Sequence, residues 1–173
     1  MTSMISDTIK KLAIIFFAAI SVKATCSYSM KDVSYPPEVK TARVNYIENK
    51  ARYVNPQLSP QLTDKLKQKI ISQTRLAVIN TDEAHYDISG SITDFSVNTS
   101  GISGQTASSN NLNVTVHIIF KNRLDEKKNF ETDITRNFPF SASISFADAQ
   151  TRLMDDILKN ISDDIFNKIF SNW

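Results

Sequence analysis

The sequence predicts an α+β two-layer sandwich, in which two helices pack on one face of a mostly antiparallel sheet of four to five strands. Three stretches alternate apolar and polar residues, as strands with one buried face do: residues 86–92, 112–120 and 130–138. Two others, residues 62–70 and 154–169, repeat apolar residues at three- and four-residue steps, which indicates amphipathic helices. The expected order is β-α-β-β-β-β-α, and no internal repeat or second domain is visible.

The first predicted strand covers residues 39–47, because Ala42, Val44 and Tyr46 fall on one side of the chain. A loop follows over residues 48–58. Ser59 is then expected to cap the first helix, with Pro60 at the first helical position, where a backbone N–H has no partner to lose. The expected core residues of this helix are Leu62, Leu66, Ile70 and, beside them, Ile71.

A short strand is expected within residues 74–80, and the longest alternation in the chain follows it. One face of that strand carries four residues: Tyr86, Ile88, Gly90 and Ile92. Phe95 and Val97 have the opposite parity, and a one-residue shift of this kind predicts a β-bulge. Residues 98–111 are rich in Ser, Thr and Asn, and we expect a long, mobile hairpin loop there.

The next two strands are joined by a charged turn at residues 121–128. Ser145 and Asp148 have the spacing of a capping box at the start of the last helix. The stripe of this helix consists of Met154, Ile157, Leu158, Ile161, Ile165 and Ile169. A helix this long and one-sided must lie on an apolar surface, and the sheet is the obvious partner.

The N-terminal segment has the form of a secretory signal peptide: Lys10 and Lys11, an apolar run over residues 12–22, and a small-residue exit at the single cysteine, Cys26. The apolar run is too short to span a membrane. We expect a signal peptide over residues 1–25, a lipidated tether over 26–37 with Cys26 acylated, and one domain over 38–173. The alternative is an ordinary cleavable signal that leaves Cys26 as a free thiol.

Charge and composition exclude several classes of function. Without residues 1–25 the chain keeps 17 Lys and Arg against 17 Asp and Glu, so nothing in its charge favours nucleic acid. His85 and His117 lie far apart, and no zinc-ligand spacing or nucleophile motif is present. The carboxylates at residues 155–156 and 163–164 are helix neighbours and point in different directions. We therefore expect no enzyme, no cofactor and no metal.

One cluster of cations stands out, in the turn between the last two predicted strands. It consists of Lys121, Arg123, Lys127 and Lys128. Asp125 and Glu126 accompany it, so the cluster has a plain interpretation as a soluble turn. The functional interpretation is contact with the phosphates of a lipid head group, because Lys and Arg are the usual partners of such anions.

The chain as a whole resembles the LptE family of outer-membrane lipopolysaccharide-assembly lipoproteins, in a diverged branch. The resemblance rests on an ordered set of segments: Cys26 with residues 27–29, and residues 35–39, 54–56, 58–70, 72–76, 88–94, 111–120, 164–168 and 172–173. It implies two helices on a mostly antiparallel sheet. It also implies a protein that plugs the LptD β-barrel, assists its assembly and binds lipopolysaccharide, with Cys26 as the acylated residue.

Two functions therefore remain open. The first is a non-enzymatic subunit of the lipopolysaccharide translocon, anchored to the bacterial outer membrane by palmitate-type acylation and placed within or below its partner barrel. The second is a free-standing, periplasm-facing lipoprotein that binds another ligand or envelope component. A compact, near-neutral domain with a polar outer surface suits the first, because the interior of an outer-membrane barrel is polar.

Overall fold

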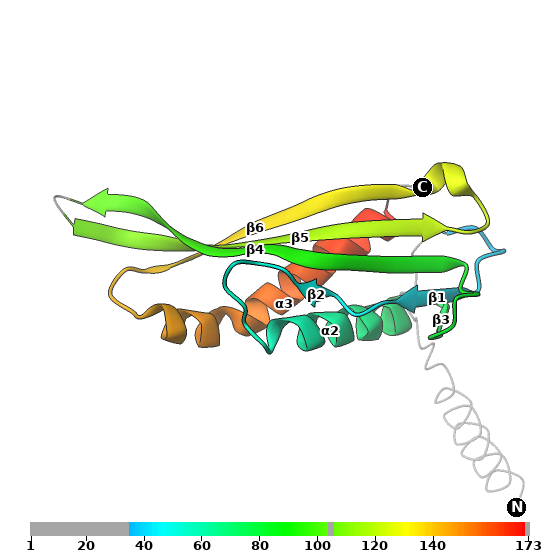
Figure 1. The fold of residues 1–173 in the computed structure, drawn as a ribbon, viewed down its shortest axis with the longest axis horizontal. Coiled ribbons are helices and arrows are strands. Elements are labelled where there is room, and N and C mark those ends of the chain that lie inside the picture. Colours follow the sequence, from blue (N-terminus) through cyan, green and yellow to red (C-terminus); the bar gives the residue numbers. More distant parts are fainter. Residues whose placement is uncertain (1–34, 104–105, 172–173) are drawn as a thin grey trace, which may run out of the picture. The chain divides into compact units, whose positions relative to one another are not determined.

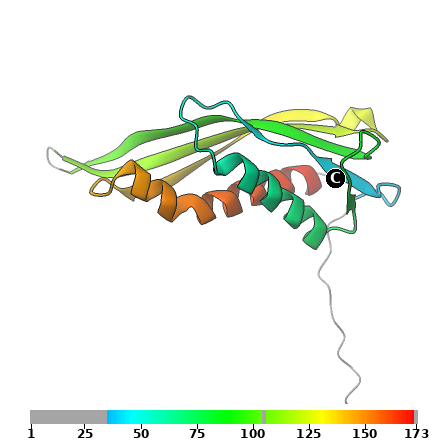
Figure 2. The same cartoon turned by 60° about the horizontal axis from the view of Figure 1, so that its bottom comes forward.

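The domain has two layers, a six-stranded sheet and a pair of helices on one of its faces (Figures 1 and 2). The computed structural model describes residues 35–103 and 106–171. The elements are β1 (Thr41–Val44), β2 (Glu48–Asn49), α2 (Leu58–Gln73), β3 (Ala77–Val78), β4 (Tyr86–Ser103), β5 (Thr106–Asn122), the 3₁₀ turn η1 (Glu126–Lys128), β6 (Phe130–Ser141) and α3 (Phe146–Phe170). The predicted α+β sandwich with two helices on one face is confirmed.

The sheet is mixed, in the order β3-β1-β4-β5-β6, with β2 also paired to β4. Consecutive hairpins make β4, β5 and β6 antiparallel. The three short strands pair parallel, β1 with β3 and both β1 and β2 with β4. The β1–β3 connection contains α2, as parallel neighbours require a crossover. Gly90 on β4 sits against β5 so closely that a Cβ there would lie 2.3 Å from the His117 carbonyl oxygen.

Helix α2 buries its predicted stripe, since Leu62, Leu66 and Ile70 are fully inaccessible to solvent. Its start differs from the prediction. Gln57, not Ser59, occupies the N-cap position, and its side chain makes no capping hydrogen bond. Ser59 lies inside the first turn, buried, and its hydroxyl has no hydrogen-bond partner among the described residues. Ile71 was also wrongly assigned to the core: it is 54% exposed, because it lies one helical step away from Ile70.

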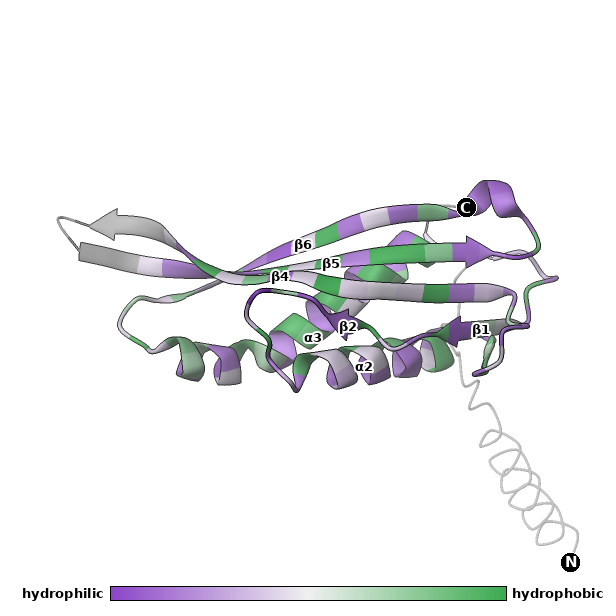
Figure 3. Ribbon diagram, in the orientation of Figure 1, coloured by the Kyte–Doolittle hydropathy of each residue, from purple (hydrophilic) through white to green (hydrophobic). Residues whose placement is uncertain are grey.

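Strand β4 contains the predicted bulge, which appears as a register shift between Ile92 and Asp94. Tyr86, Ile88 and Ile92 are buried before the shift, and Phe95 is buried after it. In β1 the alternation ends at Val44, so Ile47 is buried and Tyr46, expected in the core, is 58% exposed. Figure 3, coloured by hydropathy, shows both hydrophobic and hydrophilic positions along the ribbons of β4 and β5.

The prediction of a long, mobile loop over residues 98–111 is wrong. Strand β4 continues to Ser103 and β5 begins at Thr106, so most of this stretch is paired hairpin. Ladder hydrogen bonds join backbone groups, and Ser, Thr and Asn side chains do not prevent them. The register with β5 shifts on either side of Gly101. The hairpin projects beyond the first turn of α3 (Figure 1).

Helix α3 begins as predicted, with Ser145 as N-cap. The Ser145 hydroxyl accepts a hydrogen bond from the Asp148 backbone N–H at 3.1 Å and donates one to the Asp148 carboxylate at 2.7 Å. Ile157, Leu158, Ile161, Ile165 and Ile169 are buried, and Met154 is half-buried. Helices α2 and α3 contact each other beneath the sheet (Figure 2).

The predicted signal peptide, Cys26 and most of the predicted tether lie outside the described residues. Among the described helices, neither is both long and apolar enough to cross a membrane.

Candidate functional site

The basic cluster lies on an ordered turn at one end of the sheet, between β5 and β6. Lys121, Arg123, Lys127 and Lys128 are all exposed. The turn is built around Asn122, which is 2% exposed. Its side-chain oxygen accepts hydrogen bonds from the backbone N–H groups of the second and third residues after it, at 2.9 and 3.2 Å. The four cations therefore project from a fixed backbone.

Asn129 and Asp125 complete the turn. The Asn129 side-chain oxygen accepts the Asn122 backbone N–H at 2.6 Å. Asp125 caps the 3₁₀ turn, because its carboxylate accepts the Lys127 N–H at 3.2 Å. Both side chains accept hydrogen bonds from backbone N–H groups, so the structure of the turn is enough to explain why they are polar. Asp125 is an internal cap rather than part of a ligand site.

Two of the cations, Lys121 and Arg123, lie beside an existing ion pair. Lys121 is opposite Asp87 in the β4–β5 register. Asp87 accepts hydrogen bonds from Arg43 and from Asn45. Burial alone would raise the pKa of Asp87, but the hydrogen bonds from Arg43 and Asn45, with the charges of Arg43 and Arg123, hold this pKa below its ordinary value. Part of the positive charge at this edge is thus already balanced.

Lys128 has a different environment, because it meets an apolar pocket between β6 and the end of α3. The pocket has a volume of about 360 Å³, and its lining residues are Phe120, Lys128, Phe130, Glu131, Thr132, Lys168 and Ile169. Phe120 and Ile169 form its floor and are each 1% exposed. We call this the basic pocket.

Lys168 is the residue of this pocket that sequence reasoning missed. It comes from the last turn of α3, and its ammonium lies 5.9 Å from the centre of the Phe130 ring. The sequence places Lys168 on a polar helix face. Lys168 and Lys128 line the same pocket only because α3 lies along β6, which the sequence does not show. Two ammonium groups beside aromatic and aliphatic walls suit an anion attached to an apolar body. The Glu131 carboxylate also lines this pocket, and its negative charge opposes the binding of an anion there.

The two histidines take part in local structure. His85 precedes β4, and its Nδ1 accepts the Lys40 backbone N–H at 3.1 Å. His117 lies on the helix-free face of the sheet, where its Nδ1 is 2.8 Å from the Asp133 carboxylate and its Nε2 is 3.7 Å from Glu131. No group of three or more His, Cys, Asp or Glu residues in the described part of the chain could hold a metal ion.

The adjacent carboxylates of α3 reach in different directions, as helix geometry predicts. Asp163 forms ion pairs with Lys69 of α2 and with Lys159. Asp164 forms a bidentate ion pair with Arg136 of β6. Burial would raise the pKa of Asp163, but the hydrogen bonds from its two lysines lower that pKa below the ordinary value. These carboxylates connect α3 to its neighbours and do not face each other.

The comparisons with known proteins agree with this architecture. No curated protein matches the sequence. A crystal structure of a protein from Xanthomonas campestris has a TM-score of 0.58 at 11% identity, covering 79% of this chain and 87% of that one. A minor lipoprotein from Acinetobacter baumannii has a TM-score of 0.50 at 16% identity, covering 77% and 94%. At these identities the likeness shows the fold.

The family comparison is more specific. A family model described as lipopolysaccharide-assembly, LptE, matches residues 39–169. The match runs from the residues before β1 to the last turn of α3, so it covers both layers of the domain. The chain therefore belongs to the LptE family of lipopolysaccharide-assembly proteins.

Proposed function

We propose that this protein is a non-enzymatic outer-membrane lipoprotein that plugs an LptD-type β-barrel, assists its assembly and supports lipopolysaccharide transport to the cell surface. The observation that carries the proposal is the family match across residues 39–169. The proposal includes a signal peptide over residues 1–25 and an acylated Cys26 followed by a tether.

The helix-free face of the sheet supports a place in a polar barrel interior. Its side chains are half-buried to exposed and almost all polar: Asp87, Ser89, Ser91, Asn113, Thr115, His117, Glu131, Asp133 and Thr135. Several of these side chains interact across strands. The hydroxyls of Thr115 and Thr135, for example, form a hydrogen bond at 3.0 Å. A broad polar face with paired charges can lie against a hydrated wall without burying unpaired groups.

The test is recovery of the partner from membranes. The full chain with Cys26 intact and a C-terminal affinity tag is captured from a mild detergent extract, and the bound proteins are identified by mass spectrometry. We expect a large β-barrel protein in amounts similar to the bait, and none from cells that carry the untagged chain. Recovery of the folded bait without a barrel would favour a free-standing lipoprotein instead.

Acylation of Cys26 is tested separately by metabolic labelling with a palmitate analogue. We expect the label on the wild-type chain and its loss in Cys26→Ser, because only a thiol at this position can take the anchor. An unlabelled wild-type chain that is nevertheless exported would leave an ordinary cleavable signal and a free Cys26.

A further inference from the structure

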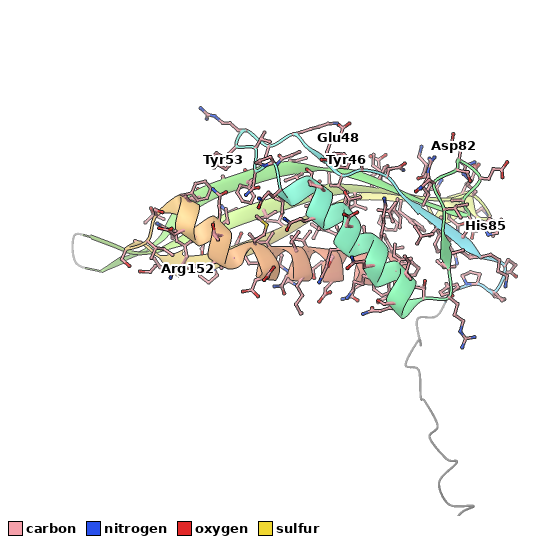
Figure 4. The ribbon with its side chains drawn as sticks, turned by 90° about the horizontal axis from the view of Figure 1, so that it is seen from below. Tyr46, Glu48, Tyr53, Asp82, His85 and Arg152 are labelled. Atoms are coloured by element: carbon pink, nitrogen blue, oxygen red, sulfur yellow. The ribbon has the colours of Figure 1, made fainter. Side chains whose placement is uncertain are left out.

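A second apolar pocket lies at the opposite end of the domain, where α3 begins. Its volume is about 690 Å³, within the range of small-molecule sites. Its lining residues are Arg52, Tyr53, Asp94, Phe95, Ser96, Val97, Asn110, Phe140, Ile144 and Phe146. Tyr53, from the β2–α2 connection, lies at this end of the domain (Figure 4). We call this the aromatic pocket.

Three rings form the core of the aromatic pocket. Tyr53 is stacked on Phe95, with ring centres 6.0 Å apart, and meets Phe146 edge-on at 5.0 Å. Gln150, which is 7% exposed, donates a hydrogen bond to the Tyr53 hydroxyl at 3.1 Å and accepts one from Asn55 at 2.9 Å. Two part-buried hydrogen bonds therefore link the Tyr53 hydroxyl, through Gln150 of α3, to Asn55.

The β-bulge explains why the pocket is apolar. After the shift between Ile92 and Asp94, Phe95 and Val97 share the face on which the helices pack. Val97 is 37% exposed and Tyr53 is 46% exposed, so a substantial apolar surface at this site stays in contact with water. An apolar ligand that covers it gains free energy in proportion to the area removed from water.

The rim of the pocket carries two charges of opposite sign, those of Arg52 and Asp94. Arg52 is exposed and makes no hydrogen bond or ion pair with any other residue that the structure describes. The Asp94 carboxylate accepts a hydrogen bond from the Ser96 hydroxyl at 2.9 Å but keeps its negative charge, so it opposes an anion on its own side of the pocket. A guanidinium group binds phosphate through paired N–H donors, so Arg52 is suited to the phosphate of a ligand.

We propose that the aromatic pocket binds one acyl chain of a phosphate-bearing lipid. The acyl chain lies against Tyr53, Phe95 and Phe146, and the phosphate lies at Arg52. Phospholipids and the lipid part of lipopolysaccharide both carry an acyl chain together with a phosphate. This inference rests on the pocket alone and not on a barrel partner.

The experiment uses the full chain carrying Cys26→Ser, so that an acyl group on its own cysteine cannot compete. Two probes with the same acyl chain are titrated by calorimetry below their micelle concentrations: 1-lauroyl lysophosphatidic acid and 1-monolauroylglycerol. We expect both to bind, with the phosphate-bearing probe about three- to tenfold tighter, as a charge-assisted contact at an exposed site provides.

Two variants separate the parts of the site. Arg52→Ala should abolish the preference for the phosphate-bearing probe and leave the affinity for the glyceride unchanged. Val97→Glu, which places a carboxylate at the pocket wall, should weaken both probes by about tenfold or more. Ile71→Glu is the matched control, because Ile71 is an exposed apolar residue of α2 outside the pocket, and it should bind like the parent.

Equal binding by Val97→Glu and Ile71→Glu, or no binding by the folded parent, would overturn the proposal. Displacement of the probe by lipopolysaccharide or by a phospholipid supports it and identifies the source, and displacement by neither overturns it. In the detergent capture, Val97→Glu should still recover the barrel. Loss of the barrel in this variant alone would make the pocket a protein contact and leave the proposed function standing.

Discussion

At the scale of single residues, Asp87 connects the short strand β1 to the long hairpin. Its side chain is 12% exposed and takes the bidentate contact of Arg43, whose side chain is 17% exposed. Alternation along β4 predicts an outward Asp87, but the sequence does not place Arg43 opposite it. That pairing follows from the parallel β1–β4 register, in which Arg43 is the partner of Asp87.

Replacing Asp87 with Asn should destabilise the domain by about 1–3 kcal/mol at pH 7, because it removes the bidentate carboxylate from the partly buried Arg43 guanidinium, which keeps only its ion pair with the exposed Asp82. The pKa of Asp87 lies below its ordinary 3.8, so its contribution is present above that value and is lost as pH falls through the lower, folded-state pKa. The difference between wild type and Asp87→Asn should therefore shrink as the pH falls below 3.8. Urea unfolding followed by circular dichroism at several pH values measures it.

Asp64→Asn is the control, since Asp64 is exposed on α2 and should change stability by less than about 0.5 kcal/mol at any pH. An Asp87→Asn variant with the same loss of stability at pH 3 and pH 7 would contradict the assigned charge pairing.

At the scale of elements, the two helix starts differ in how well the sequence predicts them. Ser145 and Asp148 form the expected local contacts, because both groups lie within one turn. Ser59 fails as a cap because the chain enters α2 two residues earlier, at Gln57, whose N–H donates to the Asn55 side-chain oxygen at 2.9 Å. The core stripes were predictable from periodicity, whereas the start of α2 also involves contacts of Asn55 with Asn49 of β2 and with Gln150 of α3, which periodicity does not show.

Two alanine substitutions test this difference. Ser145→Ala should lower the free energy of unfolding by about 1 kcal/mol, the usual effect of removing an N-cap hydroxyl. Ser59→Ala should be neutral or stabilising, because it removes a buried hydroxyl without a hydrogen-bond partner among the described residues. Ser145→Thr keeps a hydroxyl that can both accept from the Asp148 N–H and donate to its carboxylate, and it should preserve stability. Equal destabilisation by Ser59→Ala and Ser145→Ala would show that Ser59 caps α2 in solution.

At the scale of the whole domain, the basic pocket and the aromatic pocket lie at opposite ends of β5 and β6. Phe120 pairs with Phe130 at the first end, and Asn110 pairs with Phe140 at the second. Ten residues of strand separate them by about 33 Å. The sequence showed the four turn cations, because they are neighbours in the chain. It showed neither pocket, since each is assembled from distant segments.

Charge reversal in the β5–β6 turn tests whether the turn cations contribute to lipopolysaccharide binding. Lys127→Glu with Lys128→Glu should weaken binding to immobilised lipopolysaccharide by about tenfold at low salt, because both exposed cations lie at the proposed phosphate contact. Surface charges are screened beyond about 10 Å at 0.1 M ionic strength, so the effect should fall as salt rises. Both changes leave the Asn122 hydrogen bonds of the turn intact.

The matched control is Lys65→Glu with Arg152→Glu, two exposed cations of α2 and α3 with the same change in net charge (Figure 4 shows Arg152). If binding depends on net charge alone, both double variants lose affinity equally. The turn is then a solvent-exposed connection without a specific role in lipopolysaccharide binding. If only the turn variant weakens, Lys168→Ala provides the next distinction. It leaves the four turn cations in place and should reduce affinity only if the basic pocket, and not the turn alone, holds the phosphate.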